Sequence, residues 1–303
     1  MKCNSCGRES VAFIRYNGTH LCQEHFNRYV ERRIRLEFRN ELTIKGDTKI
    51  GVALSGGKDS AVALYETKKI FGNRKDVKII AITVDEGISS YRPKTMVSAR
   101  KLAERLGVEH HIATVEEKYA VTMDKVAEKG ELIPCSYCGV FRRRLLNDLS
   151  LDLKIDYLVT GLNMDDTAQS IIMNLARGEV DRLGRMGPHL RAKEGLIPRL
   201  QPLRKIPEKE VLLFAILNGI EFSHDTCPYA NFALRNEFRD SIDRWEERTP
   251  GTKFAILNSY DRIREILDHN ILPNMNKCKI CGAPTAGEIC KSCTMKREME
   301  EWK

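Results

Sequence analysis

The residues best suited to chemistry lie at positions 55–60, Ser-Gly-Gly-Lys-Asp-Ser. An apolar run of strand type, residues 50–54, precedes them, and a helical pattern follows from residue 61. A strand that enters a helix through paired glycines leaves backbone N–H groups pointing at whatever lies over the helix N-terminus, where the helix dipole favours an anion. We therefore predict a phosphate-binding loop made of Ser55, Gly56, Gly57, Lys58, Asp59 and Ser60.

The spacing within this loop excludes the commonest nucleotide-binding motif. A Walker A loop has four residues between its first glycine and its Gly-Lys pair, whereas Gly56 and Gly57 directly precede Lys58. The loop instead resembles the PP-loop of ATP pyrophosphatases, which cleave ATP between the α and β phosphates and adenylate a carbonyl oxygen of the substrate. The structural alternative is a Gly-Gly turn between a core strand and an ordinary helix.

Two sets of metal-ligand type lie near the two ends of the chain. Each consists of two tight pairs, the layout of a zinc finger or zinc ribbon, in which tetrahedral closure stabilises a segment too small for its own core. The first set is Cys3, Cys6, Cys22 and His25, and the second is Cys278, Cys281, Cys290 and Cys293. We expect one structural Zn²⁺ at each set. For the first, the alternative is a surface His25 beside a free, buried Cys22.

Three further cysteines, Cys135, Cys138 and Cys227, make an incomplete tetrahedral set. Three thiolates are the natural ligands of a [4Fe–4S] cluster whose fourth iron is open to a substrate atom such as sulfide. The spacing leaves other interpretations open. Cys135 and Cys138 could be a redox or persulfide-carrying pair with Cys227 as the resolving thiol. The three could also bind zinc with an unidentified fourth group, or the pair could be structural.

Apolar runs alternate with helical patterns through the middle of the chain. The runs cover residues 77–84, 108–115 and 156–160, and the helical patterns cover residues 95–106, 141–149 and 167–176. This alternation predicts an α/β fold with a doubly wound, mainly parallel sheet, whose ligand site lies at the carboxyl ends of the strands. Ser55, Asp85 and Gly161 all fall at such ends.

Two adjacent carboxylates, Asp165 and Asp166, follow the strand that ends near Gly161 and begin a helix. Either could hold Mg²⁺ on the ATP phosphates or act as a base, because Lys58 and Asp59 are expected to face the same crevice. The alternative is that both carboxylates only cap the helix.

Arginines gather in three places where they could bind phosphate or remain a solvated surface. A helix over residues 25–40 is expected to carry Arg28, Arg32, Arg35 and Arg39 opposite Phe26, Val30, Ile34 and Phe38. Residues 178–205 lack a clear period and are expected to form a loop with Arg182, Arg185, Arg191, Arg199 and Arg204. Arg142, Arg143 and Arg144 follow Cys138 closely. A further amphipathic helix is expected over residues 254–269.

Composition narrows the class of protein. The chain has 303 residues, a net charge of +8, which is compatible with nucleic-acid binding, and 30% charged residues, a share that hints at a thermophile. No stretch approaches the roughly twenty apolar residues of a membrane span, and the N-terminus lacks the apolar segment of a signal peptide. We therefore predict a cytoplasmic protein, not bound to membranes, whose ten cysteines serve metal binding rather than disulfides.

Together these motifs resemble the tRNA 2-thiolation enzymes of the TtcA/TtuA type within the PP-loop ATPases, most of all the TtuA-like members. The resemblance covers nearly the whole chain, from the first cysteine pair to the last. We divide the chain accordingly into a zinc finger at residues 1–26, a basic linker helix at 27–47, a PP-loop catalytic domain with the Fe–S site at 48–270, and a zinc ribbon at 271–303.

The resemblance implies a reaction and its partners. ATP would adenylate O2 of a tRNA uridine, sulfur would be transferred to C2, and AMP would leave. ATP would lie near Ala53, Leu54, Val84, Arg142 and Gly161 as well as the loop. The expected target is uridine or ribothymidine 54 of the T-loop, with the wobble uridine as the alternative. The implied partners are tRNA, a ubiquitin-like sulfur-carrier protein with a C-terminal thiocarboxylate, and a second copy of the chain.

Two other classes of function fit parts of the pattern. A PP-loop ligase or amidotransferase that adenylates a small carboxylate would not need Cys135, Cys138 or Cys227. A zinc-ribbon RNA-binding protein whose PP-loop has lost activity would release no pyrophosphate. Pyrophosphate release in the presence of tRNA separates the binding protein from both enzymes.

Overall fold

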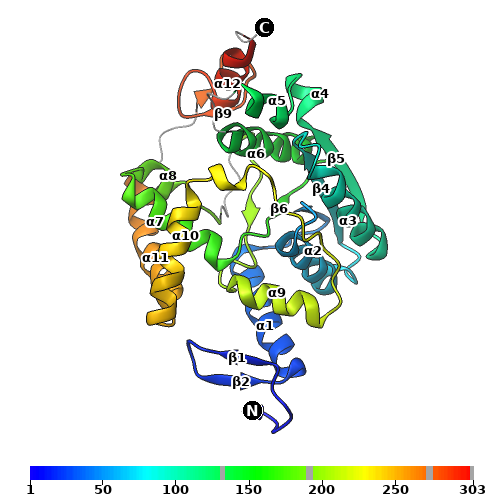
Figure 1. Ribbon diagram of the computed structural model, residues 1–303. Helices are drawn as coiled ribbons and strands as arrows, with labels where there is room; N and C mark the ends of the chain where they lie inside the picture. Colours follow the sequence, from blue (N-terminus) through cyan, green and yellow to red (C-terminus); the bar gives the residue numbers. More distant parts are fainter. Residues whose placement is uncertain (130–133, 189–193, 271–275, 301–303) are drawn as a thin grey trace.

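A five-stranded parallel sheet forms the centre of the computed structural model, which describes residues 1–129, 134–188, 194–270 and 276–300 (Figure 1). The strand order is β5-β4-β3-β6-β7. The strands are β3 (Thr48–Ala53), β4 (Val77–Asp85), β5 (Glu109–Thr114), β6 (Tyr157–Val159) and β7 (Arg199–Leu200). All four neighbouring pairs are parallel, which confirms the predicted doubly wound α/β fold. The order reverses between β3 and β6, where such folds bind ligands.

Side-chain alternation along β4 divides the core into two layers. Ile79 and Ala81 face a cluster with helices α1 (Gln23–Glu41), α2 (Lys58–Phe71), α3 (Arg92–Arg105) and α9 (Glu208–Leu217). Ile80 and Ile82 face the opposite layer, which includes α6 (Pro134–Asp152). Helix α1 buries its predicted apolar face in the main core and is therefore an integral part of the fold.

A separate group of helices packs beside α7 (Met164–Ala176). It comprises α8 (Val180–Gly184), α10 (Arg235–Arg248) and α11 (Thr252–Asn270). Met164, Ile171 and Tyr260 are almost fully buried within this group. The helix predicted over residues 254–269 corresponds to α11.

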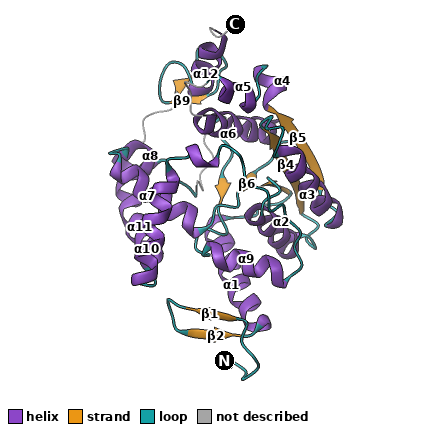
Figure 2. Ribbon diagram, in the orientation of Figure 1, coloured by secondary structure: helices purple, strands orange, loops and turns teal. Residues whose placement is uncertain are grey.

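The two ends of the described chain form small modules at opposite ends of the molecule (Figure 1). One holds the hairpin β1 (Ala12–Ile14) and β2 (Thr19–Leu21), and the other holds β8 (Asn276–Lys277), β9 (Pro284–Thr285) and α12 (Lys291–Glu300). Strands in the described part of the chain are confined to the central sheet and these two hairpins (Figure 2). Short helices α4 (Val115–Tyr119), α5 (Met123–Glu128) and η1 (Ala230–Phe232) complete the fold.

The prediction of a plain loop over residues 178–205 is wrong. This segment contains α8 and the edge strand β7, whose two residues are too few to produce a recognisable period. Arg204 is 4% exposed and forms a two-pronged ion pair with Asp261, so it does not face solvent. Arg191 lies outside the described residues. Among the described helices, none is both long and apolar enough to cross a membrane.

Candidate nucleotide and cysteine site

The loop at residues 55–60 has the conformation of an anion cradle. Gly56 adopts φ +90°, and a Cβ there would lie 2.0 Å from the carbonyl oxygen of Thr95, so only glycine fits. The Ser60 hydroxyl accepts the backbone N–H of Ser55 at 3.1 Å and donates to the Gly57 carbonyl at 2.9 Å. No side chain caps α2 at Gly57. The first N–H groups of α2 therefore remain available for a phosphate.

Gly161 and the loop approach each other closely, as the resemblance implies. A Cβ on Gly161 would lie 2.7 Å from the carbonyl carbon of Asp59. The Asp59 carboxylate accepts the side-chain amide of Asn163 at 3.0 Å and pairs with Lys58 at 3.0 Å, while Lys58 also pairs with Glu208 at 2.6 Å. Burial raises the pKa of Asp59 despite the lysine. The start of α7 and the PP-loop thus form one continuous polar site.

The two adjacent aspartates of α7 have different environments. Asp165 is 6% exposed, and its oxygens accept hydrogen bonds from Lys253 and from the backbone N–H of Glu208. Asp166 forms a capping box with Asn163 and pairs with Arg235 at 2.9 Å. Burial raises the pKa of Asp166, and the charge of Asp59 raises it further. Asp166 therefore shares the nucleotide side with Asp59, whereas Asp165 is tied to α10 and α11 through Lys253.

A buried arginine joins the carboxyl ends of β3 and β4. Arg92 is 2% exposed and donates to the backbone carbonyls of Ser55 and Val84. It also pairs with Glu86 at 2.8 Å, and Arg142 lies 3.5 Å from the same carboxylate. This chain of contacts connects the PP-loop to helix α6.

The structure brings the three internal cysteines together beside this chain of contacts. The Cys135 thiol donates to the carbonyl of Tyr229 at 3.2 Å. Cys138 and Cys227 pack on the same apolar cluster. Burial raises the pKa of Cys135, and the charge of a Cys227 thiolate raises it further. Burial raises the pKa of Cys138 to about 11, partly opposed by Arg142.

The three internal sulfurs are spaced more widely than the ligands of a single ion. Among the described residues, only the two terminal sets gather their ligand atoms within 4.8 Å of one another. Three thiolates that bind different irons of one cluster do not need to meet at a point. The soft donor set and its wider spacing therefore fit a [4Fe–4S] cluster better than a lone Zn²⁺.

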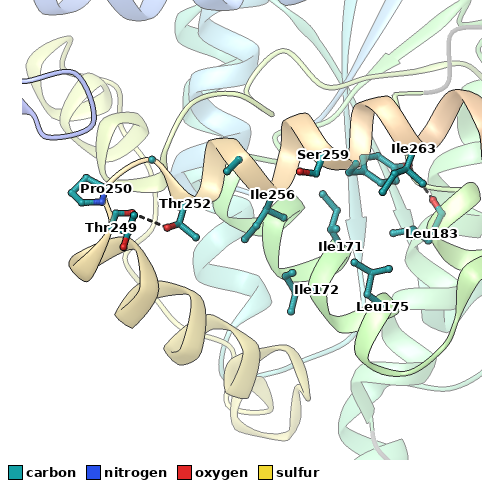
Figure 3. Close-up of a pocket in the computed structure, with 13 residues that line it drawn as sticks. Ile171, Ile172, Leu175, Leu183, Thr249, Pro250, Thr252, Ile256, Ser259 and Ile263 are labelled. Atoms are coloured by element: carbon teal, nitrogen blue, oxygen red, sulfur yellow. Dashed lines mark hydrogen bonds between the residues drawn. The ribbon is translucent and has the colours of Figure 1, made fainter.

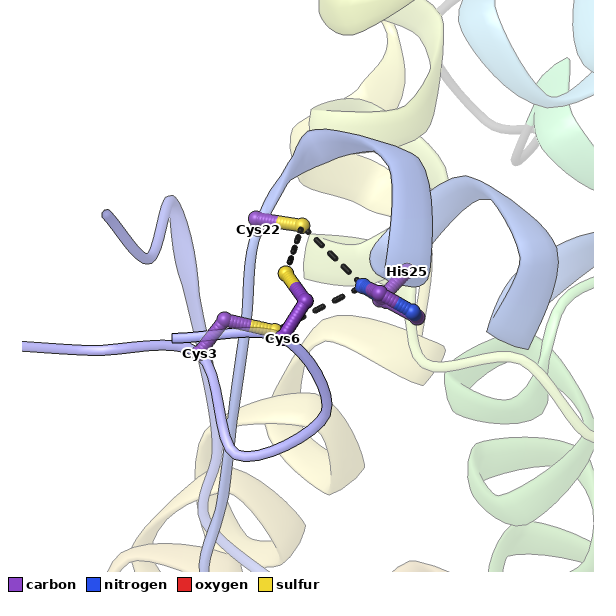
Figure 4. Close-up of side chains that lie close together, drawn as sticks. All are labelled: Cys3, Cys6, Cys22 and His25. Carbon is purple, nitrogen blue, oxygen red and sulfur yellow. Dashed lines mark hydrogen bonds between the residues drawn. The ribbon is translucent and has the colours of Figure 1, made fainter. Parts of the chain in front are cut away.

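The terminal sets have the compact arrangement of single-ion sites. In the first, the Sγ of Cys22 lies 3.2 Å from Nδ1 of His25 and 3.6 Å from the Sγ of Cys6 (Figure 4). In the second, the Sγ of Cys281 and Cys290 are 3.6 Å apart. Each set, three thiols with one imidazole or four thiols, could hold one metal ion, and these donor types suit tetrahedral zinc.

A separate apolar groove lies between α7 and α11 (Figure 3). Ile171, Leu175, Ile256 and Ile263 are among its lining residues, and no carboxylate, thiol or basic group lines it. It therefore lacks the groups needed for nucleotide or sulfur chemistry.

Sequence reasoning missed five charged residues of the site, namely Glu86, Arg92, Glu208, Arg235 and Lys253. Glu86 alone had a usable signal, since it lies two residues after the predicted strand end at residue 84. The others reach the site from helices whose role depends on tertiary packing.

The sheet order, the glycine-rich loop and the polar crevice beside it define a PP-loop protein. The PP-loop domain family matches residues 26–244, and the family described as the N-terminal LIM domain of 2-thiouridine synthetase TtuA matches residues 2–27. The chain belongs to the PP-loop family of tRNA 2-thiolation proteins.

Relatives along the full length support this assignment. The chain is 35% identical to the tRNA 2-thiolation protein NcsA of Haloferax volcanii over 99% of each chain. It is 34% identical to the tRNA-5-methyluridine(54) 2-sulfurtransferase of Pyrococcus horikoshii, covering 97% of this chain and 93% of the relative. The solved structure of the U34-tRNA thiolase NcsA from Methanococcus maripaludis, with its [4Fe–4S] cluster, is similar with a TM-score of 0.86 and 35% identity, covering 99% and 96% of the two chains.

Proposed function

We propose that the protein is a tRNA sulfurtransferase that replaces O2 of a tRNA uridine with sulfur at the expense of ATP. The observation that carries the proposal is the direct connection between its two reactive sites. Arg92 donates to the Ser55 carbonyl of the loop and pairs with Glu86, and Arg142 of the cysteine-bearing helix α6 lies 3.5 Å from the same carboxylate. A base adenylated over the PP-loop would therefore lie next to the three thiols without having to leave the protein.

In the first step, uridine O2 attacks the α-phosphate of ATP, the bond to the β-phosphate breaks, and pyrophosphate leaves. Backbone N–H groups of residues 55–60 and the Lys58 ammonium would stabilise the charge that develops on the phosphates. Asp59 and Asp166, which both contact Asn163, would hold Mg²⁺ there, and the buried pairing of Asp165 with Lys253 supports a positioning role for Asp165. The remaining nucleotide contacts are assigned to Ala53, Leu54, Val84, Arg142 and Gly161.

In the second step, sulfide attacks C2, the bond from C2 to the adenylated oxygen breaks, and AMP leaves with that oxygen. Cys135, Cys138 and Cys227 would hold a [4Fe–4S] cluster, which supplies an open iron that can carry sulfide. Two zinc ions would hold the terminal modules. We infer cytoplasmic location, a thiocarboxylated sulfur carrier and a homodimer from the family resemblance.

The position of the target uridine is a separate part of the proposal. Relatives of nearly equal identity are named for position 54 and for position 34. We retain position 54 as the expectation, with position 34 as the alternative outcome of the same experiment.

Three measurements on anaerobically purified protein test the proposal. With ATP, unmodified tRNA and sulfide as the sulfur source, the wild type should release pyrophosphate and form 2-thiouridine, detected by mass analysis of nucleosides and located by fragment mapping. Cys227→Ala should lose iron and thiolation but keep ATP binding. The exposed neighbour Thr226→Ala is the matched control and should keep all three.

Other results would support the alternatives. Pyrophosphate release that needs a small carboxylate and not tRNA would indicate a ligase. A protein that binds tRNA but releases no pyrophosphate would be a binding module. If the anaerobically reconstituted protein contains zinc but no iron, the cluster is ruled out and a persulfide relay through the three cysteines becomes the mechanism.

A further inference from the structure

The segment that carries Cys227 has no regular secondary structure. Residues 220–227 form neither helix nor strand, and Thr226 and Pro228, on either side of the cysteine, are exposed. Cys227 itself is partly buried and packs on the apolar cluster that Cys138 also contacts. Because the segment has no ladder of backbone hydrogen bonds, the contacts at its two ends determine where the Cys227 thiol lies.

One end of this segment is bonded to the PP-loop. The backbone N–H of Ser223 donates to the carbonyl of Gly56 at 2.8 Å. The Ser223 hydroxyl then donates to Asp225 at 2.6 Å, and Asp225 pairs with the exposed Lys94 at 3.3 Å. The Cys227 segment therefore starts from the nucleotide loop.

The other end is held by Asp124 of α5, whose carboxylate joins two further segments. One oxygen accepts the hydroxyl of Tyr229 at 2.7 Å, and the other accepts the backbone N–H of Ser89, in the loop after β4, at 2.8 Å. The backbone carbonyl of Tyr229 lies 3.2 Å from the Sγ of Cys135. One carboxylate thus fixes the residue that contacts Cys135 and follows Cys227 by two positions.

We propose that Asp124 is a positioning residue for the cysteine site, because through Tyr229 it sets the place of Cys227 relative to Cys135. The proposal rests on the proposed function, since it assigns Asp124 to the three thiols of that reaction. Hydrogen bonds to a carboxylate are shorter and stronger than those between neutral groups. Residues that orient ligands without touching the metal strongly affect how well the metal is held.

The surrounding contacts confine this role to the Cys227 segment. Helix α5 is attached to the loop after β4 by its own backbone, because Met123 N–H donates to the Glu86 carbonyl at 3.0 Å and Asp124 N–H to the Gly87 carbonyl at 3.4 Å. Deleting the Tyr229 hydroxyl would leave these bonds and the bond to Ser89 intact. The loss would therefore release the Cys227 segment and not α5.

The test uses Tyr229→Phe, which keeps the ring and the backbone carbonyl beside Cys135. In iron-free protein, the rate at which iodoacetamide alkylates Cys227 is followed by peptide mass mapping. We expect this rate to rise about fivefold, as does the rate of iron loss from the reconstituted protein to a chelator. ATP affinity should not change, because the bond from Ser223 to Gly56 remains.

A second background tests whether the hydroxyl acts through Asp124. Asp124→Ala removes the bonds to both Tyr229 and Ser89 and should raise both rates at least as much as Tyr229→Phe does. Adding Tyr229→Phe to Asp124→Ala should change neither rate by more than about twofold, because the hydroxyl then has no acceptor.

Tyr157→Phe is the matched control. The Tyr157 hydroxyl donates to the carbonyl of Thr43 at 3.0 Å, at the amino end of β6 and so at the opposite edge of the sheet from the ligand site. This variant also loses one tyrosine hydrogen bond, but its Cys227 alkylation and iron loss should match the wild type. Circular dichroism and thermal melting confirm that each variant is folded.

The outcomes separate the role of Asp124 from the proposed function. Unchanged rates in Tyr229→Phe, or a full effect of that substitution in the Asp124→Ala background, would overturn the positioning role. Equal acceleration in Tyr157→Phe would show that both rates follow global stability and would overturn it too. If the wild type takes up no iron, the proposed cluster fails, and the alkylation rates of the iron-free protein still decide the role of Asp124.

Discussion

The two terminal modules have nearly the same metal-ligand chemistry but contact different parts of the molecule. The N-terminal module docks on α1, α9 and the α10–α11 region, away from Cys135, Cys138 and Cys227. The C-terminal module docks on α6, the helix that carries Cys135 and Cys138. Similar ligand sets at the two ends can therefore have different consequences for the site between them.

The N-terminal module is anchored by one tyrosine. The hydroxyl of Tyr16 donates to Glu210 at 2.7 Å and accepts from Arg33 at 2.8 Å, and it contacts the Tyr29 hydroxyl at 2.6 Å. Its ring packs edge-on against Phe254 of α11 at 4.6 Å between centroids. These contacts attach the module to the scaffold behind the site.

The C-terminal module is anchored on the cysteine-bearing helix α6 and on the short helix α4. Tyr137 of α6 donates to Glu298 at 2.8 Å, and Tyr119 of α4 contacts the Ser292 hydroxyl at 2.7 Å. Met295 and Met299 of α12 are buried in the same apolar cluster as Phe141, on which Cys138 and Cys227 also pack. A zinc ion that folds this module would thus help to hold α6 in place.

The largest expected effect comes from removing one zinc ligand at each end. Cys6 and Cys281 are the exposed members of their sets, and each lies near one arginine, Arg8 or Arg144. Structural zinc contributes on the order of 10 kcal/mol to the folding of such modules. Cys6→Ser and Cys281→Ser should each lower zinc by one ion per chain, but only Cys281→Ser should lower iron uptake, by about tenfold.

Metal analysis after anaerobic reconstitution measures both effects. Near-ultraviolet circular dichroism separates loss of one module from global unfolding. Equal iron content in the two variants would mean that α6 holds the cysteines without help from the C-terminal module. The different docking of the two modules would then have no consequence for the cysteine site.

The sequence predicted the elements whose information is local. The PP-loop, the paired cysteines and the apolar runs of β3 and β4 each lie within a few consecutive residues, so type and spacing were enough. The same holds for the apolar face of α1, where Phe26, Val30 and Ile34 recur at helical spacing and are fully buried.

The rest depends on contacts between distant segments. Asp165 and Asp166 are neighbours in the chain, yet Lys253 binds the first and Arg235 the second, and no local pattern predicts that division. Nothing in the sequence distinguishes Arg204 from the other arginines of residues 178–205, because its partner Asp261 lies on a distant helix. The sequence likewise does not predict where each module docks, because the docking depends on single side chains such as Tyr16 and Tyr119.

The next largest effect concerns the core contact between α1, which follows the N-terminal module, and α2. Glu66 is fully buried in α2, and burial and Glu31 raise its pKa from 4.5 to about 7, opposed by Lys69 and Arg35. The folded state therefore binds a proton that the unfolded state has lost between these two values. The free energy of unfolding is therefore highest below about pH 4.5. It falls by about 3 kcal/mol as the pH rises from there through 7.

Glu66→Gln removes the ionisable carboxyl group and keeps the shape of the side chain. Denaturant unfolding at pH 5 and pH 8 should show that the variant gains about 3 kcal/mol relative to the wild type between the two values. Glu41, whose pKa burial also raises to about 7, is unchanged in both proteins and cancels. A difference that does not vary with pH would contradict the assignment of this titration to Glu66.

A smaller effect should follow from deleting the hydroxyl that anchors the N-terminal module. Tyr16→Phe keeps the ring on Phe254 but removes one hydrogen bond from Glu210 and one from Arg33, which still pair with each other at 3.2 Å. The loss of these two hydrogen bonds should cost about 2 kcal/mol. Urea unfolding measures this loss. Tyr65→Phe is the control, since the Tyr65 hydroxyl makes no hydrogen bond within the described ranges. Iron content should not change in either variant, and a loss of iron from Tyr16→Phe would contradict the separation of the two anchors.

The smallest effect on stability is expected from Tyr119→Phe, which, unlike Tyr16→Phe, should weaken iron retention. Tyr119→Phe removes the contact with Ser292 but keeps the ring stacked on Phe141, at 4.0 Å between centroids, so unfolding should cost only about 1 kcal/mol less. Because that contact joins the C-terminal module to the neighbours of α6, the rate of iron loss to a chelator should rise by about fivefold, the equivalent of that energy. Tyr16→Phe would then be the less stable protein with the more persistent iron. If iron loss instead followed global stability, Tyr16→Phe would lose iron faster, and the place where a module docks would not matter to the site.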